Sequence, residues 1–180
     1  MIYISHALDE VIRLADHVVI VEAGRVVRFG PLLETLSDPT LSPHLGRFEA
    51  GSVLACQVAS HDPAMASSAL TFAGGTLRVP QVTSAVGTKL RIRIRARDVS
   101  LALSEPQDVS ITNRLAGTLT TLTPEGGRAG NGPYVDAAVA IGPSILHALI
   151  TRESVARLRL TPGMPVWALI KTVSFDRRSG

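Results

Sequence analysis

The chain has 180 residues, of which 46% are hydrophobic, so it can bury a core in one ordinary domain or two small ones. Only 4% of residues are aromatic, which leaves few stacking platforms for single strands and makes nucleic-acid binding a weak interpretation despite the net charge of +3. A single cysteine, Cys56, excludes an internal disulfide and a cysteine-cluster metal site, and the five histidines are far apart, so we expect no metal site.

No stretch approaches the roughly 18 uninterrupted apolar residues of a membrane-spanning helix. The first six residues also lack the basic segment of a secretory signal, and two acidic residues follow at once, Asp9 and Glu10. We therefore expect a soluble cytoplasmic protein whose contact with a membrane requires a partner.

Residues 1–36 have the pattern of an α/β segment. An apolar strand is expected at residues 2–5, and the apolar residues of 8–15 then recur at helical spacing. The β-branched run 18–21 predicts a strand buried on both faces, with residues 26–29 as its antiparallel partner after a turn at Gly24. These strands need sheet neighbours that the chain hardly contains, so we expect that the missing neighbours belong to upstream sequence and that the chain is a truncated product or a fragment.

A loop rich in Ser, Pro and Asp follows at residues 37–43, and the pattern then changes to short strands separated by turns. We expect a remnant of an α/β domain at residues 1–48 and a mainly β domain at 49–180, with OB-like barrel subdomains at about 52–108 and 109–176. Strands are predicted at 53–59, 69–72, 76–79, 89–95, 99–103, 115–122, 134–141, 144–150 and 166–173, and one helix is predicted near 152–158, capped by Thr151.

Residues 4–11 (ISHALDEV), 15–21 (ADHVVIV), 24–26 (GRV) and 30–31 (GP) resemble, in this order, the end of an ABC ATPase domain. The resemblance implies that His6 corresponds to the switch histidine, which contacts the γ-phosphate of ATP and the attacking water in an intact ATPase. An imidazole can donate to a phosphate oxygen from the end of a strand. The alternative interpretation of His6 is an ordinary residue at the start of a helix.

The remaining ATPase motifs are missing from the sequence. It contains no Gly-rich P-loop ending in Lys and Ser or Thr, no acidic strand that holds magnesium and no signature loop. We therefore expect that this chain is not an enzyme by itself and that ATP and magnesium bind only in the intact parent protein.

Residues 93–101, 110–117 (SITNRLAG), 150–155, 160–163 and 168–171 resemble the C-terminal region of molybdate importer ATPases, which carries a TOBE or mop-like domain. Such domains resemble OB folds, associate as dimers or higher oligomers, and hold molybdate or tungstate at subunit interfaces. The resemblance therefore implies an oxyanion-binding, dimerising domain.

Molybdate is a tetrahedral dianion whose oxygens only accept hydrogen bonds, so its site needs converging donors. We select Ser110, Thr112, Asn113 and Lys171 as candidate donors. The family usually has arginine at the position of Thr112, and Arg114 follows two positions later, so the site is weakened if that arginine contacts the anion. In the alternative interpretation, Ser110 and Asn113 satisfy the backbone at a strand entrance and Lys171 extends from an edge strand into water.

Five cations alternate with apolar residues over 89–97, which places them on one face of a strand. Two interpretations remain open: a basic surface that recruits acidic partners or nucleic acid, and a solvated face paired with neighbouring carboxylates. The cations are Lys89, Arg91, Arg93, Arg95 and Arg97.

Together these patterns predict the C-terminal regulatory part of the ATP-binding subunit of a molybdate or tungstate ABC importer. The expected partners are a second copy, bound through the β domain, and a transmembrane permease subunit, which would place the protein in the cytoplasm at the inner membrane. Two alternatives remain: a stand-alone mop-type module that binds or stores molybdate, and an OB-type nucleic-acid-binding domain.

Overall fold

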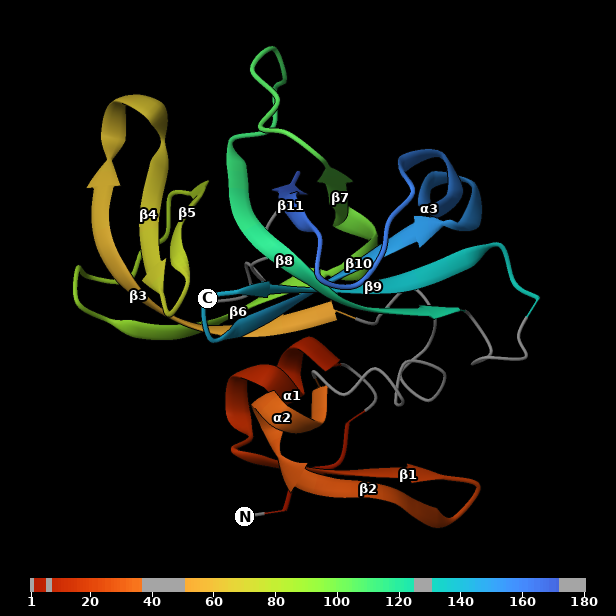
Figure 1. Cartoon of the computed structure of the whole chain (residues 1–180). Coiled ribbons are helices and arrows are strands. Elements are labelled where there is room, and N and C mark those ends of the chain that lie inside the picture. Colours follow the sequence, from red (N-terminus) through yellow and green to blue (C-terminus); the bar gives the residue numbers. More distant parts are fainter. Residues whose placement is uncertain (1, 6–7, 37–50, 125–130, 172–180) are drawn as a thin grey trace.

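The computed structural model describes residues 2–5, 8–36, 51–124 and 131–171. Most of its ordered elements are strands, so the predicted mainly β class is confirmed. A small α/β unit at the N-terminus lies beside two β-sheets (Figure 1). No helix in these residues is long and apolar enough to cross a membrane.

The N-terminal unit is a β-hairpin covered on one face by two short helices (Figure 1). The turn of the hairpin places Ala23 at φ 48° and Gly24 at φ 75°, as a tight turn between twisted strands requires. Val18 faces inward and is buried with apolar side chains of both helices. The elements are α1 (Leu8–Leu14), β1 (His17–Glu22), β2 (Arg25–Pro31) and α2 (Leu32–Leu36).

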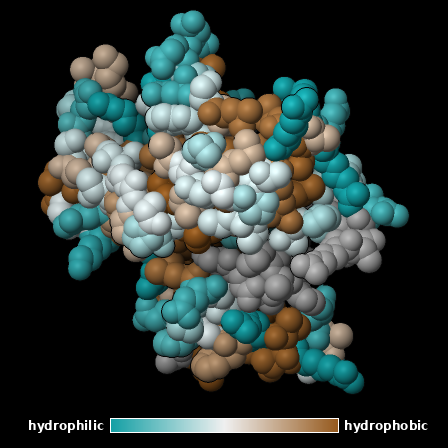
Figure 2. All heavy atoms as spheres, in the orientation of Figure 1, coloured by the Kyte–Doolittle hydropathy of each residue, from teal (hydrophilic) through white to brown (hydrophobic). Residues whose placement is uncertain are grey.

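Two predictions for this unit are wrong. Residues 2–5 form no strand, and Ile2 and Ile4 are 94% and 93% exposed, because no described strand lies beside them to complete a ladder. The strand at 18–21 forms but is buried on one face only, since Val19 and Val21 remain 53% and 60% exposed. Figure 2 shows hydrophobic side chains at the surface of this lower part of the molecule.

The first sheet has the strand order β5-β4-β3-β6, and all its neighbours are antiparallel. A two-residue turn at Ala73 and Gly74 closes the β4–β5 hairpin, one position before the predicted turn at Gly74 and Gly75, because Gly75 already pairs with Phe72 as the first residue of β5. At Gly74 any side chain would meet the carbonyl oxygen of Ile141, so this turn packs directly on the other sheet. The elements are β3 (Gly51–Asp62), η2 (Pro63–Met65), β4 (Ser67–Phe72), β5 (Gly75–Pro80) and β6 (Lys89–Arg95).

The second sheet has the order β10-β9-β8-β11-β7. Its edge strand β7 comes from the earlier part of the chain and pairs with β11. Thr151 caps α3 by accepting a hydrogen bond of 3.1 Å from the Ser154 amide, as predicted. The elements are η3 (Ala96–Asp98), β7 (Val99–Ala102), β8 (Asn113–Pro124), β9 (Tyr134–Ile141), β10 (Ser144–Thr151), α3 (Arg152–Leu158) and β11 (Pro165–Ile170).

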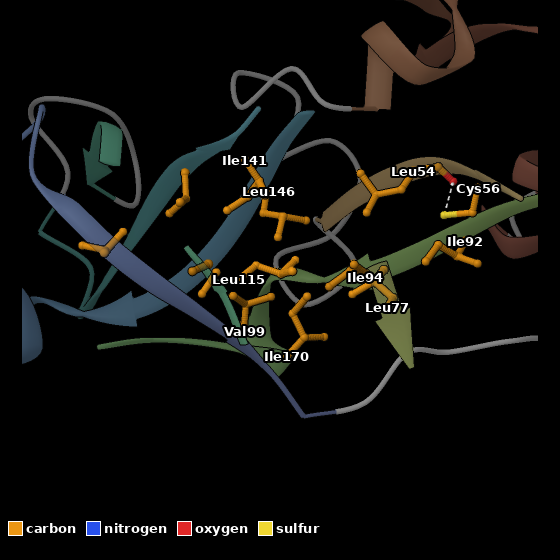
Figure 3. Packing of buried hydrophobic residues seen from close by; sticks show 14 of the residues in the cluster. Leu54, Cys56, Leu77, Ile92, Ile94, Val99, Leu115, Ile141, Leu146 and Ile170 are labelled. Atoms are coloured by element: carbon orange, nitrogen blue, oxygen red, sulfur yellow. Dashed lines mark hydrogen bonds between the residues drawn. The ribbon is translucent and has the colours of Figure 1, made fainter. Parts of the chain in front are cut away.

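The two sheets share one hydrophobic core. Leu54 and Leu77 from the first sheet pack in the same cluster as Leu115, Leu146 and Ile170 from the second sheet (Figure 3). Burial of this apolar surface from both sheets at once is the main favourable term that holds them together.

The basic strand β6 fits its predicted interpretations only in part, because Arg91 pairs with the Asp16 carboxylate but the strand does not present one solvated face. Its central arginine, Arg93, is only 4% exposed, and Arg91 is held by the N-terminal unit. The alternation of charge therefore does not produce one solvated basic face, because both faces of β6 are partly covered by other elements.

Candidate oxyanion-binding site

The candidate residues lie where β8 begins and β11 ends. Asn113 is the first residue of β8 and pairs with Ile170, the last residue of β11. Thr112 and Lys171 are the next residues beyond this pair. On the other side of β11, the Lys171 amide donates a hydrogen bond of 3.1 Å to the carbonyl oxygen of Asp98. Three of the predicted residues thus lie at one end of the sheet, where the side chain of Asn113 is buried and those of Thr112 and Lys171 are exposed.

Asn113 is buried and links the two sheets. Its Oδ1 accepts a 2.7 Å hydrogen bond from the Arg78 amide, and its Nδ2 donates a 2.8 Å bond to the Arg78 carbonyl oxygen. The side chain therefore occupies both backbone groups of a residue in β5, as a neighbouring strand would. At most one N–H of this amide can still reach an anion, because the other is used by Arg78.

The other candidate donors are at the surface. Ser110 lies in a bend before β8, and Ser110, Thr112 and Lys171 are all exposed. An ammonium and two hydroxyls near one strand end are suited to bind an anion. No set of three or more His, Cys, Asp or Glu residues within the described ranges is arranged to hold a metal ion.

Arg114 does not take the place of the arginine that the family motif has at Thr112. Its Nη1 donates a 2.7 Å hydrogen bond to the carbonyl oxygen of Pro106, and its Nε lies 4.0 Å from Glu105 Oε1. The guanidinium is therefore bound to the loop before β8. Thr112 therefore stands where the family motif has arginine, and Arg114 does not replace it.

His6 lies outside the described residues, so its predicted role stays a prediction. A buried polar group that sequence reasoning missed is the pair of His147 and Asp136, whose Nδ1 and Oδ1 atoms are 2.7 Å apart. The His147 amide also donates to Ser52 Oγ at 2.9 Å, which connects the second sheet to β3. The spacing of these residues carries no signal, because their proximity depends on strand register and on how the sheets pack.

Comparison with known proteins shows which proteins the chain resembles. The TOBE domain family matches residues 109–175. The molybdenum import ATP-binding proteins ModC of Paramagnetospirillum magneticum and Mesorhizobium japonicum are 42% and 39% identical to the chain over 177 residues, which is 98% of it. The chain is homologous to the molybdenum import ATP-binding proteins. It spans about half of their length, 47% and 46% respectively.

A solved structure supports the fold. The cytoplasmic molybdate-binding protein ModG, determined with molybdate bound, superposes with a TM-score of 0.57 and covers 68% of this chain and 93% of its own. At 21% sequence identity the likeness establishes the β architecture alone. The resemblance to molybdate importer ATPases and the mainly β fold, both predicted from the sequence, are therefore confirmed.

Proposed function

We propose that this chain is the C-terminal regulatory part of the ATP-binding subunit of a molybdate importer, and that its β domain senses the intracellular oxyanion. The observation that carries the proposal is the similarity to molybdenum import ATP-binding proteins along 98% of the chain, through both the N-terminal unit and the TOBE domain. The fold shared with a molybdate-binding protein supports the same ligand class.

The proposed oxyanion site contains Ser110, Thr112, Asn113 and Lys171. Two hydroxyls and the remaining Asn113 N–H supply neutral donors, and Lys171 supplies the positive charge that a dianion requires. Asn113 also positions the start of β8 through its bonds to Arg78. Tungstate has the same shape and charge as molybdate, so we include it in the ligand class.

Isothermal titration calorimetry of the chain with molybdate, tungstate and sulfate tests the site. We expect heat of binding with molybdate and tungstate, and an affinity about tenfold lower in Lys171→Met, since one charge-assisted contact contributes on the order of 1.5 kcal/mol. The matched control is Lys89→Met, which removes an exposed lysine from β6 and should bind as the parent does. No heat with any of the three anions would contradict the sensing function.

In the parent protein, ATP and magnesium would bind to an ATPase domain in which His6 contacts the nucleotide. The homologues' role in molybdenum import supports a permease partner, and with it a position on the cytoplasmic side of the inner membrane. We further propose that two copies associate through the β domain, so that an anion bound between them biases the position of the ATPase halves. Sedimentation with and without molybdate measures this association.

A stand-alone molybdate-binding or storage module is the second candidate, because the fold match covers 93% of the ModG chain. The presence of a permease gene beside the coding sequence distinguishes the two, since a storage module needs none. Nucleic-acid binding has no comparable support, and a salt-dependent gel shift would be its test.

A further inference from the structure

Arg91 connects the N-terminal unit to the β domain through hydrogen bonds. Arg91 projects from β6, and its Nη1 donates hydrogen bonds to the carbonyl oxygens of Ala15 at 2.7 Å and Ile12 at 3.4 Å. Its Nη2 lies 2.7 Å from Asp16 Oδ1. One guanidinium thus binds three groups at the end of α1.

These contacts supply hydrogen-bond partners to carbonyl groups at the C-terminal end of α1. The last carbonyl groups of a helix have no partner within it, and they carry the negative end of its dipole, so a cation there is stabilising. The rigid planar fork of arginine can bond several oxygens at once, which a lysine ammonium at the same position does less well. The same guanidinium lowers the pKa of the Asp16 carboxyl through its hydrogen bond and its charge.

An apolar contact lies beside the arginine. Val53 of β3 is 7% exposed and is buried with Ile12, Val18, Leu32 and Leu36 of the N-terminal unit. In the sheet, Val53 pairs with Arg93 and Ala55 pairs with Arg91, so the two contacts are close together on adjacent strands. The N-terminal unit therefore docks on the same sheet whose other residues form the common β core.

We propose that Arg91 is a positioning residue that fixes the N-terminal unit on the β domain, and thereby transmits oxyanion binding to it. The docking part stands on the contacts alone, and the transmission part rests on the proposed function. An anion that stabilises the β domain then also stabilises the docked N-terminal unit, because anion binding and docking are linked through Arg91. Without the guanidinium the apolar contact at Val53 remains, but the directional bonds that Arg91 makes to the end of α1 are lost.

Hydrogen–deuterium exchange of the whole chain tests the docking. We expect Arg91→Gln to speed exchange of the amides of α1 and the β1–β2 hairpin about tenfold while β4, β8 and β9 keep their protection. Arg91→Lys should fall between Gln and the parent. The control is Lys89→Gln, at an exposed position of the same strand, which should leave exchange unchanged. Unchanged exchange at α1, or equal acceleration throughout the β domain, would overturn the positioning role.

A second arm tests transmission. In the unsubstituted chain, saturating molybdate should slow exchange at α1. The Arg91→Gln variant should bind molybdate with the same affinity by calorimetry but show no slowing at α1. If the variant still shows the slowing, transmission through Arg91 is wrong. If the unsubstituted chain binds no oxyanion, the proposed function fails. The exchange measured without molybdate still decides whether Arg91 docks the N-terminal unit.

Discussion

Cys56 shows how burial sets the chemistry of a single residue. It is 4% exposed within the common core, and its Sγ donates a weak 3.8 Å hydrogen bond to the Leu54 carbonyl oxygen (Figure 3). Because a thiolate is poorly solvated there, burial raises the pKa of the thiol to about 12. The sole cysteine is therefore a core residue without nucleophilic character at neutral pH.

This environment predicts slow thiol chemistry. At pH 8 the folded chain should react with a disulfide reagent such as Ellman's reagent at least about a hundred times more slowly than a free thiol, since the thiolate is both scarce and covered. In denaturant, full reaction of one thiol per chain is expected, and this serves as the internal control. Rapid labelling of the folded chain would show that Cys56 is accessible.

At the scale of elements, a strand that lies between two others can have positions where only glycine fits. Gly117 of β8 is such a position, because a Cβ there would contact Ile141 and would lie 2.6 Å from the Ala140 carbonyl oxygen and 2.7 Å from Val139 Cγ1. Backbone and two core side chains would all have to move. In the second sheet, β8 and β9 are therefore closer together at Gly117 than a side chain would allow.

We predict that Gly117→Ala lowers the free energy of unfolding by about 1–3 kcal/mol through overpacking. Urea denaturation followed by circular dichroism measures this. The neighbouring Ala116→Ser, at an exposed position on the same strand, should stay within about 0.5 kcal/mol of the parent. Equal stabilities for the two variants would show that the β8–β9 contact adapts.

Elements with strong local signals were predicted well. The helix at 152–158 and its Thr151 cap form at the expected residues, and the β4–β5 hairpin forms with its turn one residue before the predicted one. The strand expected at 2–5 does not form, because an apolar run specifies a strand only when a neighbouring strand pairs with it. Local pattern therefore predicts where a strand can form, and its neighbours determine whether it does.

At the scale of the whole molecule, the two sheets depend on a common core. Strand β7 joins the second sheet through β11, and the buried cluster includes Leu77 of the first sheet and Leu119 of the second. Both leucines are fully buried. The sheets therefore have little separate stability, because each covers the apolar face of the other.

We predict that the two sheets unfold in one cooperative transition. Leu77→Ala and Leu119→Ala should each lower the stability of that transition by about 2–5 kcal/mol, with equal effects on both sheets, because each leaves a cavity in the shared core. Calorimetry and exchange at β4 and β9 measure this, and Leu103→Ala, at a partly exposed position, should have little effect. Two transitions, each shifted by only one variant, would show independent subdomains.

The sequence by itself determined the mainly β class, the family resemblance and the positions of most strands, because these depend on periodicity, turn residues and short motifs. It also selected Asn113 as a candidate anion donor, which stays a prediction, but the hydrogen bonds of Asn113 to Arg78, 35 positions away, required the tertiary structure. The same holds for Arg91, which was expected on a basic strand face and instead binds Ile12, 79 positions away. A polar side chain's partner depends on which elements pack together, and that packing is decided by the burial of the whole apolar surface rather than by any local pattern.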